Sequence, residues 1–319
     1  METETPPGGS SRLLNTVLFN DRGLRAGWRL LIYIGILFAL QFLTFSLVFH
    51  FLGKNGRLTI TELTPGFTII GDGVQFLFLL LVAFIMSRIE RRKTGEYGLP
   101  IKGEQVVRRF LSGYIFWGFL PLTLCLLTMH LLHGFSFGTL ALHGREVLVY
   151  AAEWAIAFIL VALAEEYALR GYALYTLADG IGFWPAAIIL GVLFGIGHSG
   201  NPGETRVGLV ATVIFALFAS VTLRLTGNLW LAIGAHAGWN WGQSFFYGVR
   251  DSGMVAQGHL LEPSFHGPVW LTGGTVGPEG SVVTLVLWSL MIVVFAILYR
   301  RRGPALVVFD ETQNEPRTS

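Results

Sequence analysis

Long apolar stretches recur along this 319-residue chain, and they limit its possible folds more than any other feature. A helix needs about 20 mostly apolar residues to cross the hydrocarbon core of a bilayer, where only helices and closed barrels satisfy their backbone hydrogen bonds. Charged residues make up 13% of the chain, against about 25% in a typical soluble domain. The sequence therefore predicts an all-α, multi-pass transmembrane bundle of about eight helices. The expected segments are Leu30–Phe49, Phe67–Ser87, Phe110–Leu132, Val147–Ala178, Phe183–His198, Val207–Leu223, Leu229–Tyr247 and Val282–Tyr299.

The distribution of Lys and Arg predicts how these segments are oriented. Basic residues cluster in residues 12–29, 88–109 and 300–302, whereas residues 251–280 contain neither Lys nor Arg. Loops on the cytoplasmic side of a membrane carry an excess of Lys and Arg. Eight crossings with both termini in the cytoplasm satisfy this distribution, which indicates a protein of the cell membrane. The basic residues lie in short loops rather than along one face, so nucleic acid is not an expected partner.

Three polar clusters interrupt the apolar segments, although ionisable side chains at the bilayer centre cost roughly 2.5–3.5 kcal/mol each on insertion scales. Glu166 and Arg170, in the stretch "AEEYALR", are four residues apart, so they share a helix face and can pair. Glu165 lies about 100° further round the helix and can point into a shared cavity. The other clusters are "FGIGH", which ends at His198, and "HAGWN", which begins at His236 and ends at Asn240.

The depths of these side chains in the membrane can be compared from the helical rise. If the fourth segment continues as helix to the turn at Asp179-Gly180, Glu165 lies about 20 Å from that turn. His198, on the next segment, lies about 22 Å from the same turn. We therefore expect a carboxylate, two imidazoles and an amide to meet in a polar cavity within the bundle.

A group of this composition is suited to the activation of water. A carboxylate or imidazole in a pocket of low dielectric constant can act as a general base. Two histidines and a carboxylate (His198, His236 and Glu165) could instead hold a divalent metal such as zinc, with one position open for water. His236 and Asn240 could also donate to a developing oxyanion. Each arrangement predicts hydrolysis, most directly of a peptide bond within or beside the membrane.

The three motifs together resemble those of the CPBP (Abi) intramembrane proteases, which include the type II CAAX prenyl endopeptidases and bacteriocin self-immunity proteins. "EEYALR", "FGIGH" and "HAGWN" match the family patterns Glu-Glu-x-x-x-Arg, Phe-x-x-x-His and His-x-x-x-Asn/Asp. The resemblance implies Glu165 as the base that activates water, with help from His198. It implies His236 and Asn240 as metal ligands or oxyanion donors, and Glu166 and Arg170 as supporting residues. The implied substrate is a membrane-embedded or lipidated peptide, for which a prenylated CAAX tail is one candidate.

The hydropathy pattern and the resemblance together divide the chain into six regions. The distribution of Lys and Arg places the polar clusters in the outer half of the membrane, whereas a CAAX protease should open to the cytosol. The sequence therefore does not decide to which side of the membrane the site opens. If the segment Phe110–Leu132, which Pro121 interrupts, were re-entrant, the site would open to the cytosol instead. The regions are a cytoplasmic arm (1–27), N-terminal transmembrane helices (28–146), a catalytic core (147–250), an extracytoplasmic loop (251–280), a last transmembrane helix (281–303) and a disordered tail (304–319).

Two other functions compete with this interpretation. "GHSG" is similar to the Gly-x-Ser-Gly of rhomboid serine proteases, in which case His236 would be the base for Ser199. Buried Glu, His and Arg also line the pathways of transporters and proton relays, and a non-enzymatic scaffold, as in bacteriocin immunity, could retain the same residues. Glycines at four-residue spacing (Gly191 and Gly195, then Gly234 and Gly238) predict close packing of their helices.

Overall fold

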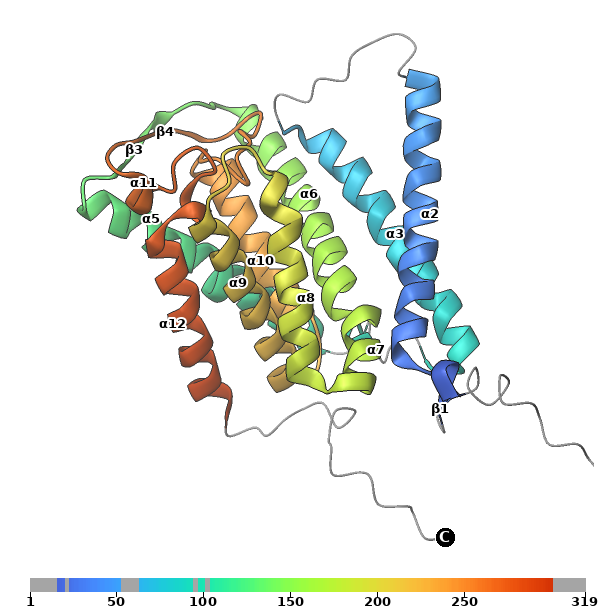
Figure 1. The fold of residues 1–319 in the computed structure, drawn as a ribbon. Helices are drawn as coiled ribbons and strands as arrows, with labels where there is room; N and C mark the ends of the chain where they lie inside the picture. Colours follow the sequence, from blue (N-terminus) through green and yellow to red (C-terminus); the bar gives the residue numbers. More distant parts are fainter. Residues whose placement is uncertain (1–15, 21–22, 53–62, 94–96, 101–103, 301–319) are drawn as a thin grey trace, which may run out of the picture.

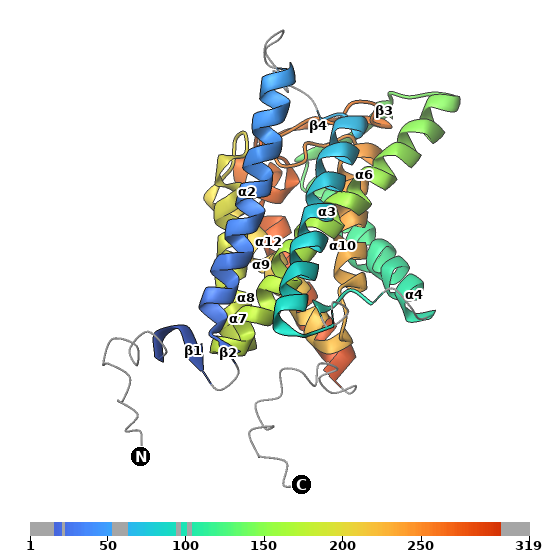
Figure 2. The same ribbon diagram turned by 90° about the vertical axis from the view of Figure 1, so that its right-hand side faces the viewer.

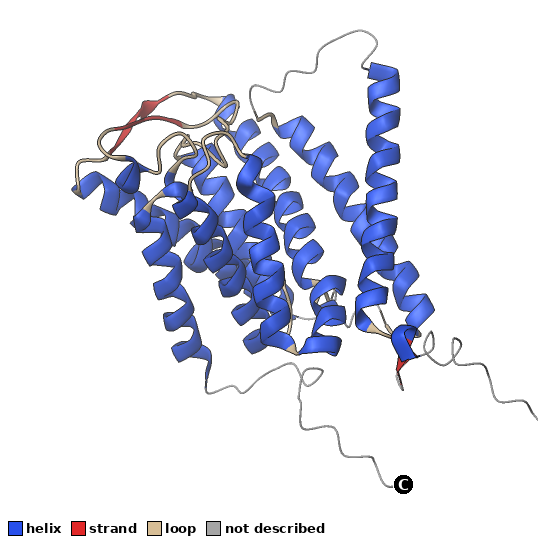
Figure 3. Ribbon diagram, in the orientation of Figure 1, coloured by secondary structure: helices blue, strands red, loops and turns tan. Residues whose placement is uncertain are grey.

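The computed structural model describes residues 16–20, 23–52, 63–93, 97–100 and 104–300. Residues 1–15 and 21–22 of the expected arm, and the whole expected tail, lie outside this part of the chain. The described residues are mainly helical, which confirms the all-α prediction (Figure 3). The helices are α2 (Ala26–Leu52), α3 (Pro65–Glu90), α4 (Glu104–Ser112), η2 (Gly113–Phe119), α5 (Leu120–Leu131), α6 (Arg145–Arg170), α7 (Tyr172–Ile181), α8 (Phe183–Gly197), η3 (His198–Gly200), α9 (Arg206–Thr226), α10 (Trp230–Trp241), η4 (Gly242–Phe246), α11 (Val269–Thr272), η5 (Pro278–Gly280) and α12 (Val282–Tyr299).

Seven helical runs in the described residues are long and apolar enough to cross a membrane, as a multi-pass membrane protein requires. Their outer faces carry large apolar side chains, and Phe38 and Ile70, for example, are each 69% exposed. Exposed apolar surface on this scale is typical of lipid contact rather than of water contact. The seven runs are Ala26–Thr44, Pro65–Glu90, Gln105–Leu131, Arg145–Ile181, Phe183–Gly200, Arg206–Thr226 and Val282–Tyr299.

The seventh expected segment, Leu229–Tyr247, differs from the prediction. It forms the shorter helix α10, followed by the π-helical turn η4, and it is not among the seven membrane-length runs. All residues from Leu231 to Asn240 are buried. Ile233 packs in one hydrophobic cluster with α3, α6, α7 and α8, and Leu231 packs in another with α5, α9 and α12. Because protein covers α10 on several sides, the helix forms the centre of the bundle.

The bundle has two distinct ends (Figures 1 and 2). The start of α2 and the end of α12 lie at one end, beside the two-residue strands β1 (Phe19–Asn20) and β2 (Gly23–Leu24). At the other end lie the antiparallel strands β3 (Phe135–Leu140) and β4 (Leu261–Phe265), which pair from Phe135↔Phe265 to Leu140↔Leu261 with an irregularity between Ser136 and Thr139. The expected loop 251–280 therefore folds back onto the segment before α6. We refer to this second end as the hairpin end.

Two expected helix shapes need correction. The fourth segment is not one straight helix, because it breaks at Gly171, where a Cβ atom would lie 2.4 Å from the carbonyl oxygen of Tyr167. The segment Phe110–Leu132, proposed as re-entrant, lies almost wholly in a helical run of membrane length (Gln105–Leu131), in which the π-helical stretch η2 changes to α-helix just before Pro121. The π-helical part of this run, η2, lies against α10.

Glycines allow α10 and the α4–η2 run to approach backbone to backbone. A Cβ atom on Gly234 would lie 2.1 Å from the carbonyl oxygen of Phe110, and one on Gly238 would lie 2.1 Å from that of Tyr114. The facing run contributes Gly113, where a Cβ atom would lie 2.2 Å from the carbonyl oxygen of Leu231. Small residues on both helices give the close packing that the glycine spacing predicted, and this contact fixes the position of α10.

A Gly238→Ala substitution is expected to destabilise the protein, because the new methyl group meets a backbone carbonyl that cannot rotate away. Overpacking of this kind costs about 1–3 kcal/mol or more. Thermal unfolding in detergent measures the change. Gly197→Ala is the matched control, since an added Cβ atom there has nothing within 4 Å. Equal unfolding temperatures for the two variants would contradict the close contact.

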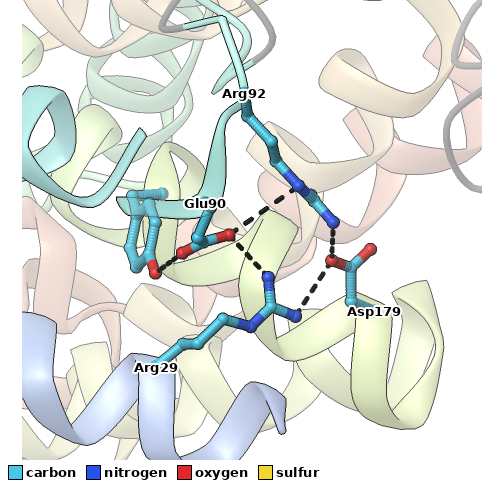
Figure 4. A network of polar contacts seen from close by, with 5 residues as sticks. Arg29, Glu90, Arg92 and Asp179 are labelled. Atoms are coloured by element: carbon cyan, nitrogen blue, oxygen red, sulfur yellow. Dashed lines mark hydrogen bonds and ion pairs between the residues drawn. The ribbon is translucent and has the colours of Figure 1, made fainter. Parts of the chain in front are cut away.

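A cluster of charged side chains joins α2, α3 and α7 at the end of the bundle opposite the hairpin end (Figure 4). Arg29 lies 2.6 Å from Glu90 and 3.1 Å from Asp179, and Arg92 lies 2.6 Å from Asp179. The hydroxyl of Tyr172 donates to the other oxygen of Glu90. The two arginines and two carboxylates balance in charge. Arg29 and Arg92, which the sequence analysis counted among the loop charges, therefore also attach α2 and α3 to the core.

Candidate active site

A cavity of about 260 Å³ lies between α3, α6, α8, α9, α10 and α12. Its wall includes Glu165, His198, His236 and Asn240, so the structure brings together the four residues that the sequence analysis selected. The kink at Gly171 does not separate Glu165 from His198, because the break lies beyond Glu165 towards the turn that leads to α8.

The two adjacent glutamates face different surroundings, as the helical geometry predicts. Glu165 lines the cavity, and its side chain is 30% exposed. Glu166 is fully buried, and Arg170 Nη1 lies 3.2 Å from its Oε2 atom. The guanidinium also lies over the ring of Phe194, 5.6 Å from its centroid. No well-aligned hydrogen bond joins Arg170 to Glu166 within the described residues, so charge attraction and the ring contact hold this buried pair.

His236 connects the two glutamates. Its Nδ1–H donates to Glu166 Oε1 at 3.0 Å, and its Nε2 lies 3.5 Å from Glu165 Oε2. The edge of the imidazole also packs against Phe215, with ring centroids 5.0 Å apart. Glu166 therefore sets the orientation of His236, and His236 in turn lies beside the carboxylate that faces the cavity.

His198 and Asn240 complete the polar wall from other helices. His198 Nδ1–H donates to the carbonyl oxygen of Phe194 at 2.8 Å, which leaves Nε2 as the lone-pair nitrogen of the neutral ring. Asn240 lies one turn beyond His236 on α10 and is 8% exposed. Its carboxamide has no hydrogen-bond partner among the described residues, so both its donor and its acceptor are available to a molecule in the cavity.

The arrangement does not match a metal-binding set. Among the residues that the structure describes, no three His, Cys, Asp or Glu side chains are grouped closely enough to hold a metal ion. His236 already has Glu166 on one nitrogen and Glu165 near the other. The suggested ligands Glu165, His198 and His236 share the cavity without converging on one point, so we derive no step through a metal.

The serine-protease alternative does not fit the geometry. Ser199 is exposed at the end of α8 and does not line the cavity. The two nitrogens of His236 face Glu166 and Glu165, so this imidazole is not paired with a serine hydroxyl. Helix α8 ends at Gly197, and in the short turn η3 that follows, His198 lines the cavity whereas Ser199 is exposed.

Three further carboxylates that the sequence analysis did not select line the same cavity. Asp72 lies on α3, and Asp251 and Glu279 lie in the segments before and after β4 and α11. Burial raises the pKa of Asp251 to about 6, and a hydrogen bond from Ser244 opposes this rise. Burial, followed by the charge of Asp251, raises the pKa of Glu279 well above its usual value. Asp72 could have been identified as a candidate from the sequence, because apolar residues surround it. The local sequence around Asp251 and Glu279 gives no such signal.

The cavity is closest to the hairpin end of the bundle. Leu63, which precedes α3, pairs with Ala256 in an isolated bridge, and Leu63 and Met254 both line the cavity. Since residues 105–131 form a helical run of membrane length, the positive-inside pattern still predicts that this end faces away from the cytoplasm. This orientation stays a prediction.

A polar cavity with paired carboxylates and imidazoles inside a bundle of membrane-length helices is compatible with hydrolysis within a membrane. A comparison with known families bears on the class of protein. Residues 146–242 match the family model described as type II CAAX prenyl endopeptidase Rce1-like, so this segment is a domain of that protease family. The match covers α6 to α10, the helices that carry the three motifs. No curated protein and no solved structure matches the chain.

Proposed function

We propose that this protein is an endopeptidase that hydrolyses a peptide bond of a membrane-associated substrate, with Glu165 as the general base. The contact series Glu166–His236–Glu165 carries the proposal, because it ends with a carboxylate at the wall of a cavity large enough for water and a peptide group. A single buried ion pair would stabilise the bundle without placing a second carboxylate at a cavity.

The proposed reaction begins with a water molecule beside Glu165. The carboxylate accepts a proton while the water oxygen bonds to the scissile carbonyl carbon. Nε2 of His198, as a lone-pair acceptor, helps to orient the water, and the carboxamide N–H of Asn240 donates to the developing oxyanion. The carbon–nitrogen bond then breaks, and the proton on Glu165 passes to the leaving nitrogen. The products are a carboxylate and an amine.

Hydrolysis explains the site better than transport does. The matched family is a family of proteases, and the polar residues lie in one cavity near one end of the bundle rather than along a path between the two ends. In this proposal Glu166 orients His236, and Arg170 pairs with Glu166, which gives both residues the supporting role that the sequence analysis assigned to them.

The proposal is tested with purified protein in proteoliposomes and peptide cleavage read by mass spectrometry. Prenylated and unprenylated tail peptides, together with transmembrane peptides, serve as substrates. We expect cleavage by the wild type and by Ser199→Ala, whose rate should stay within about twofold because Ser199 does not line the cavity. Loss of cleavage in Ser199→Ala would favour the serine mechanism. A folded wild type that cleaves none of these peptides would count against the hydrolase.

A further inference from the structure

Three carboxylates from outside the family-matched segment 146–242 also line the cavity. Asp72 comes from α3, Asp251 from the segment after η4, and Glu279 from η5. The matched segment contributes the residues proposed for hydrolysis. These three carboxylates therefore come from other parts of the chain than the residues proposed for hydrolysis, although both sets line the same cavity.

Two of these carboxylates lack the partners that buried charges usually have. Asp251 is only 7% exposed, and Ser244 donates to its Oδ2 at 2.8 Å, whereas Oδ1 has no partner among the described residues. Asp72, inside a membrane-length helix, has no hydrogen bond or ion pair with any described residue. Burying a carboxylate costs several kcal/mol unless it is paired. Both side chains line the cavity, so their missing partner can be a molecule that enters it.

The cavity wall is rich in acidic side chains. Its lining includes four carboxylates (Asp72, Glu165, Asp251 and Glu279) and two imidazoles, but no Lys or Arg among the described residues. Glu279 is held in place, because the backbone N–H of Ser252 donates to its Oε2 at 3.1 Å and the Ser252 hydroxyl lies 3.3 Å from the same atom. Burial raises the pKa of Asp251, and burial followed by the charge of Asp251 raises the pKa of Glu279.

We propose that Asp72, Asp251 and Glu279 form a subsite for a positively charged side chain, Lys or Arg, that lies close to the scissile bond of the substrate. The inference rests on the proposed function, since Glu165 in the same cavity performs the cleavage. A cationic side chain gains charge-assisted hydrogen bonds to carboxylates already fixed around it. A substrate carboxylate at the same position would face like charges, so acidic peptides are rejected.

The experiment compares membrane-inserted peptides that differ at one position near the scissile bond, which is Lys, acetyl-lysine, Gln or Glu. Binding of fluorescent peptides to wild type in detergent micelles and cleavage in proteoliposomes are measured in parallel. We expect the Lys peptide to bind and react at least about tenfold better than the acetyl-lysine and Gln peptides, because both of these lack the positive charge. The Glu peptide is expected to be the poorest of the four.

Isosteric variants connect the preference to the three carboxylates. Asp72→Asn, Asp251→Asn and Glu279→Gln keep the side-chain shape, and each is expected to reduce the ratio of Lys to acetyl-lysine peptide binding by about threefold or more. Glu262→Gln is the matched control, because Glu262 lies on β4 at the same end of the bundle but outside the cavity. This control should keep the wild-type ratio.

The outcomes separate the subsite from the hydrolase. Binding that is equal for the Lys and acetyl-lysine peptides would overturn the subsite and leave the hydrolase intact if cleavage occurs. A binding preference without cleavage of any peptide would support the subsite and count against the hydrolase. A preference that disappears when EDTA is added would identify a bound metal ion, rather than the peptide cation, as the partner of the carboxylates, and would also overturn the subsite.

Discussion

Replacing Glu165 with Gln is expected to lower kcat for peptide cleavage by about 10²–10⁴-fold, which is the usual contribution of a general base. The substitution keeps the size and the hydrogen-bonding shape of the side chain but removes the carboxylate that accepts the proton of water. Glu165 is the more exposed of the two adjacent glutamates and faces the cavity, so the fold should tolerate the change. Single-turnover cleavage in proteoliposomes measures the effect without interference from product release.

Glu153→Gln on the same helix is the matched control. Glu153 lies three turns before Glu165, is exposed and does not line the cavity, so its replacement should leave kcat within about twofold of the wild type. Thermal unfolding of both variants checks that each is folded. Cleavage that persists at the wild-type rate in Glu165→Gln would exclude this carboxylate as the base.

The sequence predicted the parts of the site that depend on local helical geometry. A spacing of four residues placed Glu166 beside Arg170, and the 100° step turned Glu165 to another face; the structure has both. The rise per residue was sufficient to bring Glu165 level with His198. The helical rise could not predict that His236 contacts both glutamates, because that contact depends on how α10 is rotated against α6.

Features that depend on long-range packing could not be predicted in the same way. Asp251 and Glu279 line the cavity because the segment after η4 folds back and β4 pairs with β3, which is separated from it by more than a hundred residues. The central position of α10 also depends on tertiary structure, since glycine contacts with the α4–η2 run hold it inside the bundle. From hydropathy alone, an apolar helix buried inside the bundle is predicted to be a membrane-spanning segment.

Replacing Arg170 with Met is expected to destabilise the protein by about 3–5 kcal/mol, the usual cost of leaving one charge of a buried pair without its partner. Arg170 is 2% exposed and Glu166 is fully buried, so water cannot reach the carboxylate that remains. Chemical or thermal unfolding in detergent measures the loss. Arg206→Met, an exposed position at the start of α9, is the control and should change stability by less than about 0.5 kcal/mol.

The double variant Glu166→Leu/Arg170→Met distinguishes the stabilising role of the pair from its role in orienting His236. Removing both charges should restore most of the lost stability, because apolar replacements of a buried pair are often neutral or stabilising. Cleavage should nevertheless stay about 10–100-fold below the wild type, since His236 Nδ1–H loses the acceptor that fixes its ring. A double variant with both wild-type stability and wild-type kcat would show that Glu166 acts only as the partner of Arg170. Full stability with slow cleavage is the result that the contact series from Glu166 through His236 to Glu165 requires.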